Sequence, residues 1–245
     1  MVNWFKKWFE KPLDPIGFDC LKTDMHSHII PAIDDGATSL EDSINMIKYL
    51  HELGYQKIIT TPHVMIDFYK NTPETILGGL EQVRAELQKQ NISVQLEAAA
   101  EYYLDYEFEE KIKAGNLLTF SDNYILVETS FTQAPPNFKE LIFQLQVAGY
   151  KVVLAHPERY PFMSIEDYED LQGRSVFMQL NLLSLIGHYG VDVQNKANKM
   201  IEQGLISFVG TDCHHMGHAA TYAKCQTTRA WHQLVGSGKL LNNTL

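Results

Sequence analysis

The sequence predicts an α/β fold, a closed or nearly closed barrel of seven β/α units that forms a single domain. Strand-like segments alternate with amphipathic helical segments at a spacing of roughly 30 residues, which is typical of a parallel sheet covered by helices. A length of 245 residues suits one such barrel. No glycine-rich phosphate loop follows the first strand, which argues against a dinucleotide-binding sheet. A doubly wound sheet is the alternative fold.

The strands are predicted at short β-branched or apolar runs that are bounded by turn residues. Pro62, for example, ends the second strand, because proline has no N–H to donate to a ladder. In chain order, the predicted strands span 23–30, 57–61, 93–99, 123–128, 151–155, 176–181 and 206–210.

The helices are predicted between the strands, and capping residues and glycines mark their ends. Ser39 caps the first helix, and Pro73 begins the second directly after Thr72. Glycines end four of the helices, at positions 54, 115, 149 and 204. In chain order, the predicted helices span 39–53, 73–90, 106–114, 136–148, 165–171, 191–203 and 219–235.

The composition is that of a globular protein with a large core, since 45% of the residues are hydrophobic and 20% are charged. A formal net charge of -10 argues against a nucleic-acid partner, so a phosphorylated substrate would need local positive charge. Three cysteines without C-x-x-C spacing favour free thiols in a reducing compartment. No apolar run reaches the roughly 18 residues of a membrane span. We therefore expect a cytoplasmic protein.

Residues 1–20 are expected to form an N-terminal arm, and the barrel domain is expected to span 21–245. The arm lacks the continuous apolar segment of a signal peptide. Its lysines are interleaved with four aromatic residues, Trp4, Phe5, Trp8 and Phe9. Packing against the barrel wall or against a neighbouring subunit of a homo-oligomer is the favoured interpretation. A short helix on a membrane surface or on a partner is the alternative.

The residues that carry chemistry follow the predicted strands, at the end where barrel enzymes build their sites. His26 and His28 are two residues apart, so both side chains point to the same face of an extended chain. Asp34 and Asp35 follow them in a turn. The sixth strand ends on Asn181, whereas every other strand ends on a potential metal ligand: His63, Glu101, Glu128, His156, Asp212 and His214 complete the set.

Each of these residues alone has an ordinary explanation, such as a satisfied histidine or a carboxylate that caps a helix. At one barrel mouth, however, five imidazoles and several carboxylates are costly to bury unless cations compensate them. The set therefore predicts a metal centre. Its roughly eight or nine donors exceed the four to six that one ion needs, so two or three ions are expected, with Glu101 as a bridge. Mixed imidazole and carboxylate donors suit Mn, Fe or Zn.

Some neighbouring residues keep two interpretations. The tyrosines between positions 102 and 106, with Phe108, either line a cleft for an aromatic substrate or pack in the core. Cys213 alternates with Asp212 and His214, so its side chain is expected to point away from theirs. His215 and His218 are close to the site in sequence, and their spacing assigns them no role.

Together these motifs resemble the PHP (polymerase and histidinol phosphatase) superfamily, and within it the bacterial CpsB/CapC-type, manganese-dependent protein-tyrosine phosphatases. The resemblance covers about residues 23 to 235, and its most specific pieces are the I-P-A-I-D-D-G-A turn and the A-H-P-E-R-Y segment. It implies a distorted, TIM-like (β/α)7 barrel of the PHP type with a trinuclear metal centre. It also implies that a metal-activated hydroxide hydrolyses phosphotyrosine on a bacterial tyrosine kinase that controls capsule or exopolysaccharide synthesis.

The resemblance also implies a role for each matching residue. One ion is assigned to His26, His28, Glu101 and Asp212, and a second to Glu101, Glu128 and His156. A third is assigned to Asp35, His63 and His214, with Asp35 preferred over Asp34; Asp35, His214 and Arg159 are counted as catalytic. Arg159 matches a family arginine that contacts phosphate. Family members often carry a second arginine after the last metal motif, where this chain has Met216-Gly217-His218-Ala219, and His218 is the expected substitute.

Three rival functions stay open. The first is another phosphatase of the superfamily, which would act on histidinol phosphate or on another small phosphate monoester. Amidohydrolase barrels also begin with H-x-H, but they usually place a bridging lysine where this chain has Glu128. A non-catalytic binding module is the third and is disfavoured by the complete ligand set. The cysteine-based route to phosphatase activity is disfavoured too, because none of the three cysteines is followed by arginine six positions later.

Overall fold

The computed structural model describes residues 13–245, so most of the predicted arm over 1–20 lies outside the described residues. The chain joins the core before residue 21, because Phe18 is fully buried between the rings of Tyr55 and Trp231. The Trp231 indole N–H also donates a hydrogen bond of 2.9 Å to the Ile16 carbonyl.

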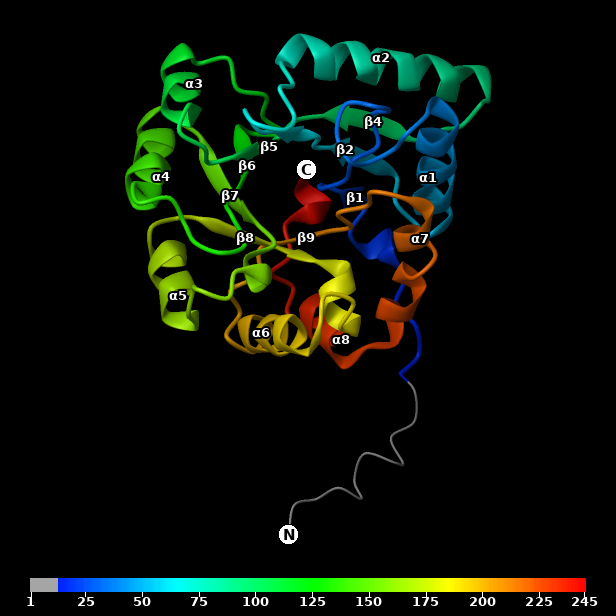
Figure 1. The fold of residues 1–245 in the computed structure, drawn as a ribbon. Coiled ribbons are helices and arrows are strands. Elements are labelled where there is room, and N and C mark those ends of the chain that lie inside the picture. The colour runs from blue at the N-terminus through cyan, green and yellow to red at the C-terminus, as the bar shows by residue number, and fades with distance from the viewer. Residues whose placement is uncertain (1–12) are drawn as a thin grey trace.

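The strands of the described residues form two parallel sheets around a common centre (Figure 1). The first sheet contains, in order, β1 (Thr23–Asp24), β2 (Lys57–Thr60) and β4 (Gln95–Ala98). The second contains β3 (His63–Val64), β5 (Glu101–Tyr103), β6 (Tyr124–Glu128), β7 (Lys151–Ala155), β8 (Phe177–Asn181) and β9 (Phe208–Gly210). The strands follow one another in chain order, whereas a doubly wound sheet reverses direction at a switch point.

The two sheets form one distorted barrel. β3 continues β2 beyond a break at Pro62, and β5 continues β4, so that nine short strands occupy the seven predicted positions among the described residues. The ring is completed by a parallel bridge between Ser27 and Cys213, where the His28 N–H donates to the Cys213 carbonyl over 2.9 Å. The α/β prediction is confirmed. The strand predicted over 23–30 is too long, because regular pairing stops at Asp24 and the chain then turns its histidines inward.

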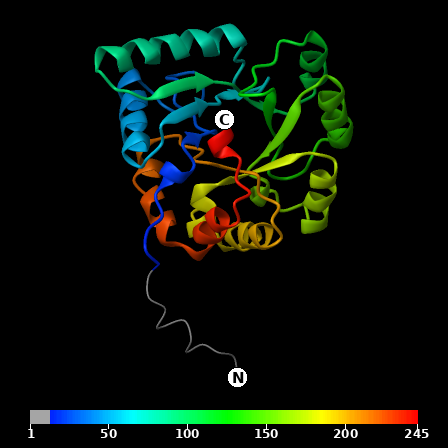
Figure 2. The same ribbon diagram turned by 180° about the vertical axis from the view of Figure 1, so that it is seen from behind.

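The helices lie outside the strands, as the two opposite views show (Figures 1 and 2). The structure has α1 (Leu40–Glu52), α2 (Pro73–Lys89), α3 (Phe108–Ala114), α4 (Phe138–Val147), α5 (Ile165–Gly173) and α6 (Val191–Glu202) near their predicted positions. Ser39 and Thr72 cap α1 and α2 as predicted, each accepting a hydrogen bond from the backbone N–H three residues later. No helix of the described residues is long and apolar enough to cross a membrane.

The single helix predicted over 219–235 is wrong. The segment divides into α7 (Met216–Ala219), a 3-10 turn (Tyr222–Thr227) and α8 (Arg229–Gly236). Tertiary contacts hold the turn, because the Tyr222 hydroxyl donates to the Thr211 carbonyl over 3.0 Å. Thr228 then begins a new helix by accepting a hydrogen bond from the Trp231 N–H.

The barrel interior beneath the carboxyl ends of the strands is apolar, and one buried cluster there contains Met25, Ile59, Ala99, Leu126, Val153 and Phe208. The C-terminal segment closes the barrel at the amino ends of the strands, and Figure 1 shows the C-terminus near the barrel centre. Asn242 joins β1 to β9: its side-chain amide donates to the carbonyls of Thr23 and Val209 and accepts from the Val209 N–H. The polar site must therefore lie at the opposite end.

Candidate metal centre

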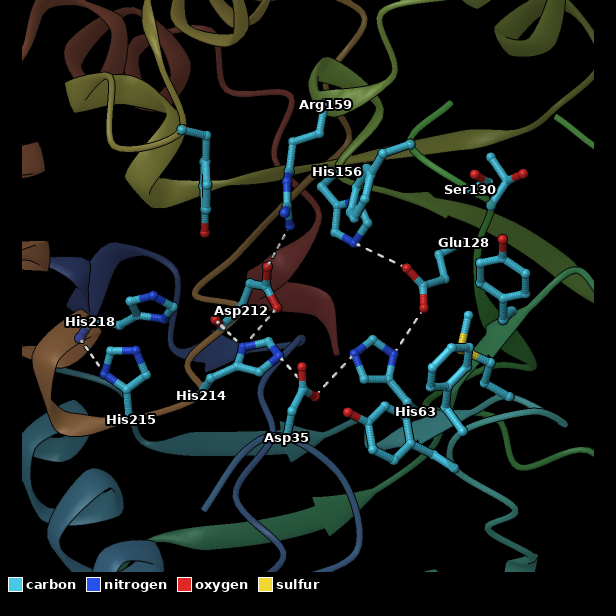
Figure 3. A pocket seen from close by; sticks show the side chains of 17 residues that line it. Asp35, His63, Glu128, Ser130, His156, Arg159, Asp212, His214, His215 and His218 are labelled. Atoms are coloured by element: carbon cyan, nitrogen blue, oxygen red, sulfur yellow. Dashed lines mark hydrogen bonds and ion pairs between the residues drawn. The ribbon is translucent and has the colours of Figure 1, made fainter. Parts of the chain in front are cut away.

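The carboxyl ends of the strands open into a cavity of about 630 Å³ (Figure 3). Most of the predicted site residues line it, namely Asp35, His63, Glu128, His156, Arg159, Asp212, His214 and His218. The other three, His26, His28 and Glu101, are fully buried and lie against them. The structure thus gathers all of the predicted site residues at one end of the barrel.

Three donor atoms at the bottom of the site, from His26, His28 and Glu101, have the spacing of a coordination shell, and Asp212 lies beside the two imidazoles. The Nε2 atoms of His26 and His28 lie 3.3 Å apart. Glu101 Oε2 lies 3.2 and 3.4 Å from these two nitrogens, and Asp212 Oδ1 lies 3.4 and 3.5 Å from them. Donors held roughly 2.0–2.1 Å from a tetrahedral ion are separated by roughly 3.3–3.4 Å. The side chains of His26, His28 and Glu101 therefore fit a bound cation, and Asp212 Oδ1 is close to both of its imidazole ligands.

Glu101 extends the donor set toward the opposite wall of the site. Its Oε1 lies 2.9 Å from His156 Nε2, while its Oε2 lies 3.1 Å from His63 Nδ1. Glu128 Oε1 lies 2.9 Å from the same His63 nitrogen. This buried nitrogen has no partner of hydrogen-bonding geometry among the described residues, although two carboxylates are close. Such a nitrogen between two carboxylates fits a second cation.

A third group lies on the open side of the cavity. Asp35 Oδ1 is 3.5 Å from His63 Nε2 and 3.5 Å from His214 Nε2, and the His214 ring stacks on His28 at 4.0 Å. His63 therefore faces two groups through its two nitrogens, whereas the resemblance assigns it to the third ion alone. Within residues 13–245, the three groups with suitable donor spacing are His26, His28 and Glu101; His63, Glu101 and Glu128; and His28, Asp35, His63 and His214.

Asp34 orients the site without facing its centre. Its Oδ2 lies 2.7 Å from His28 Nδ1 and accepts a hydrogen bond from the His63 backbone N–H. A carboxylate on Nδ1 favours the tautomer that leaves Nε2 free for a metal. The turn also requires Gly36, because a Cβ atom there would lie 2.1 Å from the His28 carbonyl oxygen.

Two of the strands end in a left-handed backbone conformation. His156 follows β7 with φ of +33°, and Asp212 follows β9 with φ of +52°. Non-glycine residues rarely adopt this region, and such strain is typical of functional sites. In both cases the turn directs the side chain into the cavity instead of along the sheet.

The carboxylates of the site favour positive charge on the groups between them. Burial opposes ionisation of Glu101, yet His26 and His63 hold the pKa of this carboxyl well below its usual range. Burial alone would also lower the pKa of His63, but Glu101 raises that pKa to about 9. A hydrogen bond from His214 lowers the pKa of Asp35 to about 2. His63 therefore holds a proton where a metal cation would bind, and metal binding must displace it.

Arg159 stands on the cavity wall in a fixed orientation. Its guanidinium carbon lies 4.3 Å from the ring centre of Phe131 and 4.5 Å from that of Tyr189. One of its nitrogens is 3.4 Å from Asp212 Oδ2. With rings near the guanidinium, its in-plane N–H groups face the cavity, which suits a phosphate.

His218 lies farther from the centre, beside His215 (Figure 3). Its ring centre is 6.0 Å from that of His214. Burial and the neighbouring His215 lower the pKa of His218 to about 4, so its imidazole is neutral at pH 7. A neutral imidazole does not supply the permanent charge of an arginine.

Sequence reasoning missed several residues of the site. Gln179, fully buried on β8, lies 2.8 Å from His26 Nδ1 through its Oε1 atom. Phe131 follows the end of β6 closely, so the strand-end rule that found the ligands would have found it, whereas Tyr189 lies beyond a 3-10 helix (Leu182–Ile186) and gives no such signal. Of the tyrosines near 102–106, Tyr103 lines the cavity, whereas Tyr102 is buried in the core with Phe108.

Comparison with known proteins is consistent with this geometry. The model of a family described as capsular polysaccharide synthesis, CpsB/CapC, matches residues 22–232. The tyrosine-protein phosphatase YwqE of Bacillus subtilis is 33% identical over 198 residues, which cover 79% of this chain and 77% of that protein. The tyrosine-protein phosphatase CpsB of Streptococcus agalactiae is 24% identical over 201 residues, covering 79% of this chain and 83% of that protein.

The fold is also similar to solved structures. One comes from work on YwqE from Bacillus subtilis and CpsB from Streptococcus pneumoniae, described as unique metal-dependent tyrosine phosphatases. It matches with a TM-score of 0.78 and 29% identity, covering 90% of this chain and 94% of that one. An amidohydrolase from Mycoplasma synoviae matches with a TM-score of 0.54 and 14% identity, covering 95% of this chain and 88% of that one. This second likeness concerns the fold alone.

Proposed function

Because the chain belongs to the CpsB/CapC family of capsular polysaccharide synthesis, we propose that it is a metal-dependent protein-tyrosine phosphatase. Its proposed substrate is phosphotyrosine on a protein, a bacterial tyrosine kinase that controls capsule or exopolysaccharide synthesis. The observation that carries the proposal is the buried group of imidazoles and carboxylates around Glu101, open to a cavity with Arg159 on its wall.

The proposed metal ligands are His26, His28, Asp35, His63, Glu101, Glu128, His156, Asp212 and His214. We propose two or three divalent ions, with manganese favoured over iron and zinc. When bound, such ions supply an activated water nucleophile and neutralise phosphate charge. Asp35 and His214 are assigned catalytic roles because their group lies on the open side, where substrate enters.

Arg159 is the proposed phosphate contact. Its planar N–H groups suit the equatorial oxygens of a phosphoryl group, whose negative charge they offset in the transition state. Phe131 and Tyr189 hold the guanidinium in that plane. His218 is proposed to add a hydrogen bond from the far side of the cavity.

The cavity also suits the aryl part of the substrate. Tyr69, Tyr103 and Phe131 line it together with Met65 and Phe68, so a phenyl ring finds apolar surface while its phosphate reaches the polar end. Phenolate leaves readily, because tyrosine has a pKa of about 10, and no strong general acid is then required. This aromatic lining favours phosphotyrosine over histidinol phosphate or a small alkyl phosphate.

Location and assembly are proposed from the thiols and from the N-terminal arm. We propose a cytoplasmic protein, in keeping with the free thiols of Cys20, Cys213 and Cys225. Residues 21–245 are proposed to form one domain. Contact of the arm over 1–20 with a membrane surface, or with a second subunit, is a further proposal that concerns mainly residues outside the described range.

The experiment is a phosphatase assay before and after removal of metals. We expect hydrolysis of a phosphotyrosine peptide to stop after chelation and to return on addition of manganese, and to exceed that of phosphoserine peptide and histidinol phosphate. Arg159→Lys should lower kcat/KM by about 10²-fold with unchanged metal content. A variant with alanine at all three cysteines is the control and should stay active. Undiminished activity in the stripped protein, or loss in the cysteine variant, would refute the proposal.

A further inference from the structure

Strand β8 contributes none of the proposed metal ligands, yet two of its side chains lie directly against them. Gln179 and Asn181 are two residues apart, so they point to the same face of the strand. Both are fully buried at the carboxyl end of the barrel. A buried amide is costly unless all its polar atoms are satisfied, so its partners identify what it does.

The two amides form a chain of hydrogen bonds between two proposed ligands. Gln179 Oε1 lies 2.8 Å from His26 Nδ1. Gln179 Nε2 donates to Asn181 Oδ1 over 2.9 Å, and Asn181 Nδ2 donates to Asp212 Oδ2 over 2.6 Å. We call these two residues the amide relay. It joins His26 to Asp212, which lie far apart in the chain.

The direction of the chain follows from a backbone contact. The His156 N–H donates to Gln179 Oε1 over 3.3 Å, and a backbone N–H is always a donor. The atom that faces His156 and His26 must therefore be the amide oxygen. An amide oxygen only accepts, so His26 Nδ1 must carry the proton. His26 Nε2, which faces His28 and Glu101, is then left with its lone pair.

The same direction determines which oxygen of Asp212 is available. Its Oδ2 accepts from Asn181 Nδ2 and lies 3.4 Å from an Arg159 nitrogen. Its Oδ1 lies 3.4 and 3.5 Å from the Nε2 atoms of His26 and His28. The relay thus leaves His26 Nε2 and Asp212 Oδ1 available for a cation, and these two atoms lie 3.4 Å apart.

We propose that Gln179 and Asn181 are positioning residues that act as one unit: they set the tautomer of His26 and the orientation of Asp212 for the first cation. This inference rests on the proposed metal centre. A purely structural role would predict two independent contacts, whose loss affects folding alone. A relay predicts that breaking either amide disturbs both ligands.

The test uses the metal-free full chain and five variants. Gln179→Met and Asn181→Leu replace each amide by an apolar side chain of similar size, alone and together. Met178→Leu, on the opposite face of the same strand, is the matched control. Gln179→Glu keeps an acceptor for His26 but loses the donor to Asn181, and it is available if the methionine variant fails to fold.

Manganese affinity by calorimetry is the first readout. Loss of a group that orients a ligand typically weakens metal affinity 10–100-fold, and we expect this for each single variant. The double variant should be weakened by about as much as either single one, because the chain is already broken. Met178→Leu should match the unchanged chain. The relay would be overturned if the affinity losses of the two single variants multiplied in the double variant. It would also be overturned if the manganese affinity of each single variant were within about twofold of that of the unchanged chain.

Nitrogen NMR of the histidine rings at alkaline pH is the second readout. His26 should be protonated on Nδ1 in the unchanged chain and in Gln179→Glu, and should become a mixture of tautomers in Gln179→Met. Protonation on Nε2 in the unchanged chain would contradict the inference. Weakened manganese binding in the variants of a protein that hydrolyses no phosphopeptide would refute the proposed function and support the relay. Full activity with unchanged manganese affinity in Gln179→Met would support the proposed function and refute the relay.

Discussion

The two ends of the barrel are built from the same strands, but one end buries apolar side chains and the other buries ionisable ones. At the amino ends, apolar side chains such as Phe120, Phe177 and Phe208 fill the interior, and the Asn242 side chain bonds to backbone groups of β1 and β9. At the carboxyl ends, buried imidazoles and carboxylates crowd around Glu101 at distances of 2.9–3.4 Å. The first end needs nothing more to be stable, whereas the second is balanced only by protons or by cations.

This difference indicates which end stabilises the fold and which performs chemistry. Changes at the amino end should alter the free energy of unfolding and leave the chemistry alone. Changes at the carboxyl end should alter metal binding and catalysis with smaller effects on folding. Three predictions test this division, in order of decreasing size.

The largest effect is expected for Glu101→Gln at the carboxyl end. An amide keeps the shape but loses the charge that faces His26, His28, His63 and His156. We expect kcat/KM on phosphotyrosine peptide to fall by about 10²–10³-fold, since several kcal/mol of transition-state stabilisation is lost, with reduced metal content. The control is Glu97→Gln on β4, which pairs with Lys57 near the surface and should be silent. A fully active Glu101→Gln variant would contradict the assignment of the chemistry to the carboxyl end.

A smaller effect is expected for Asn242→Ala at the amino end. The change leaves the buried Thr23 carbonyl and the Val209 N–H and carbonyl without a side-chain partner. We expect the free energy of unfolding in urea to fall by about 3 kcal/mol. Metal affinity of the folded protein should not change. Asn243→Ala, at the exposed neighbouring position, should have little effect on stability. Lost metal binding in a folded Asn242→Ala would show that the two ends are linked.

The smallest effect is a pH dependence confined to the carboxyl end. The pKa of His63 is raised to about 9 in the metal-free fold, against about 6.5 when unfolded. Its contribution to stability is therefore complete below pH 6.5 and is lost as pH rises to about 9. Metal binding displaces protons, so metal affinity rises with pH. The difference in Tm between loaded and metal-free protein should thus widen by a few degrees from pH 6.5 to 9. A Tm difference that stays constant from pH 6.5 to 9 in calorimetric scans would contradict the exchange of protons for cations at the carboxyl end.

Much of the fold was accessible from local signals. The strand over Lys151–Ala155 has its predicted bounds, and Ser39 and Thr72 cap helices where the sequence places them. The errors fall where distant contacts overrule local preference. The segment after Ala219 is helical by composition, but the hydrogen bond from Tyr222 to Thr211 and the cap at Thr228 divide it. The break at Pro62 was predicted, but the short strand β3, which resumes at His63, was not.

The sequence by itself determined the type of chemistry, because parallel strands all end on one side and these strands end on imidazoles and carboxylates. Only the tertiary structure decided which atoms of those side chains meet. His26 and Gln179 are separated by 153 positions, and His63 directs its two nitrogens at different carboxylates. Strand order and side-chain periodicity depend on neighbouring residues and can be read along the chain. Tautomers and ligand atoms depend on distances of about 3 Å between remote segments, which only the packed barrel defines.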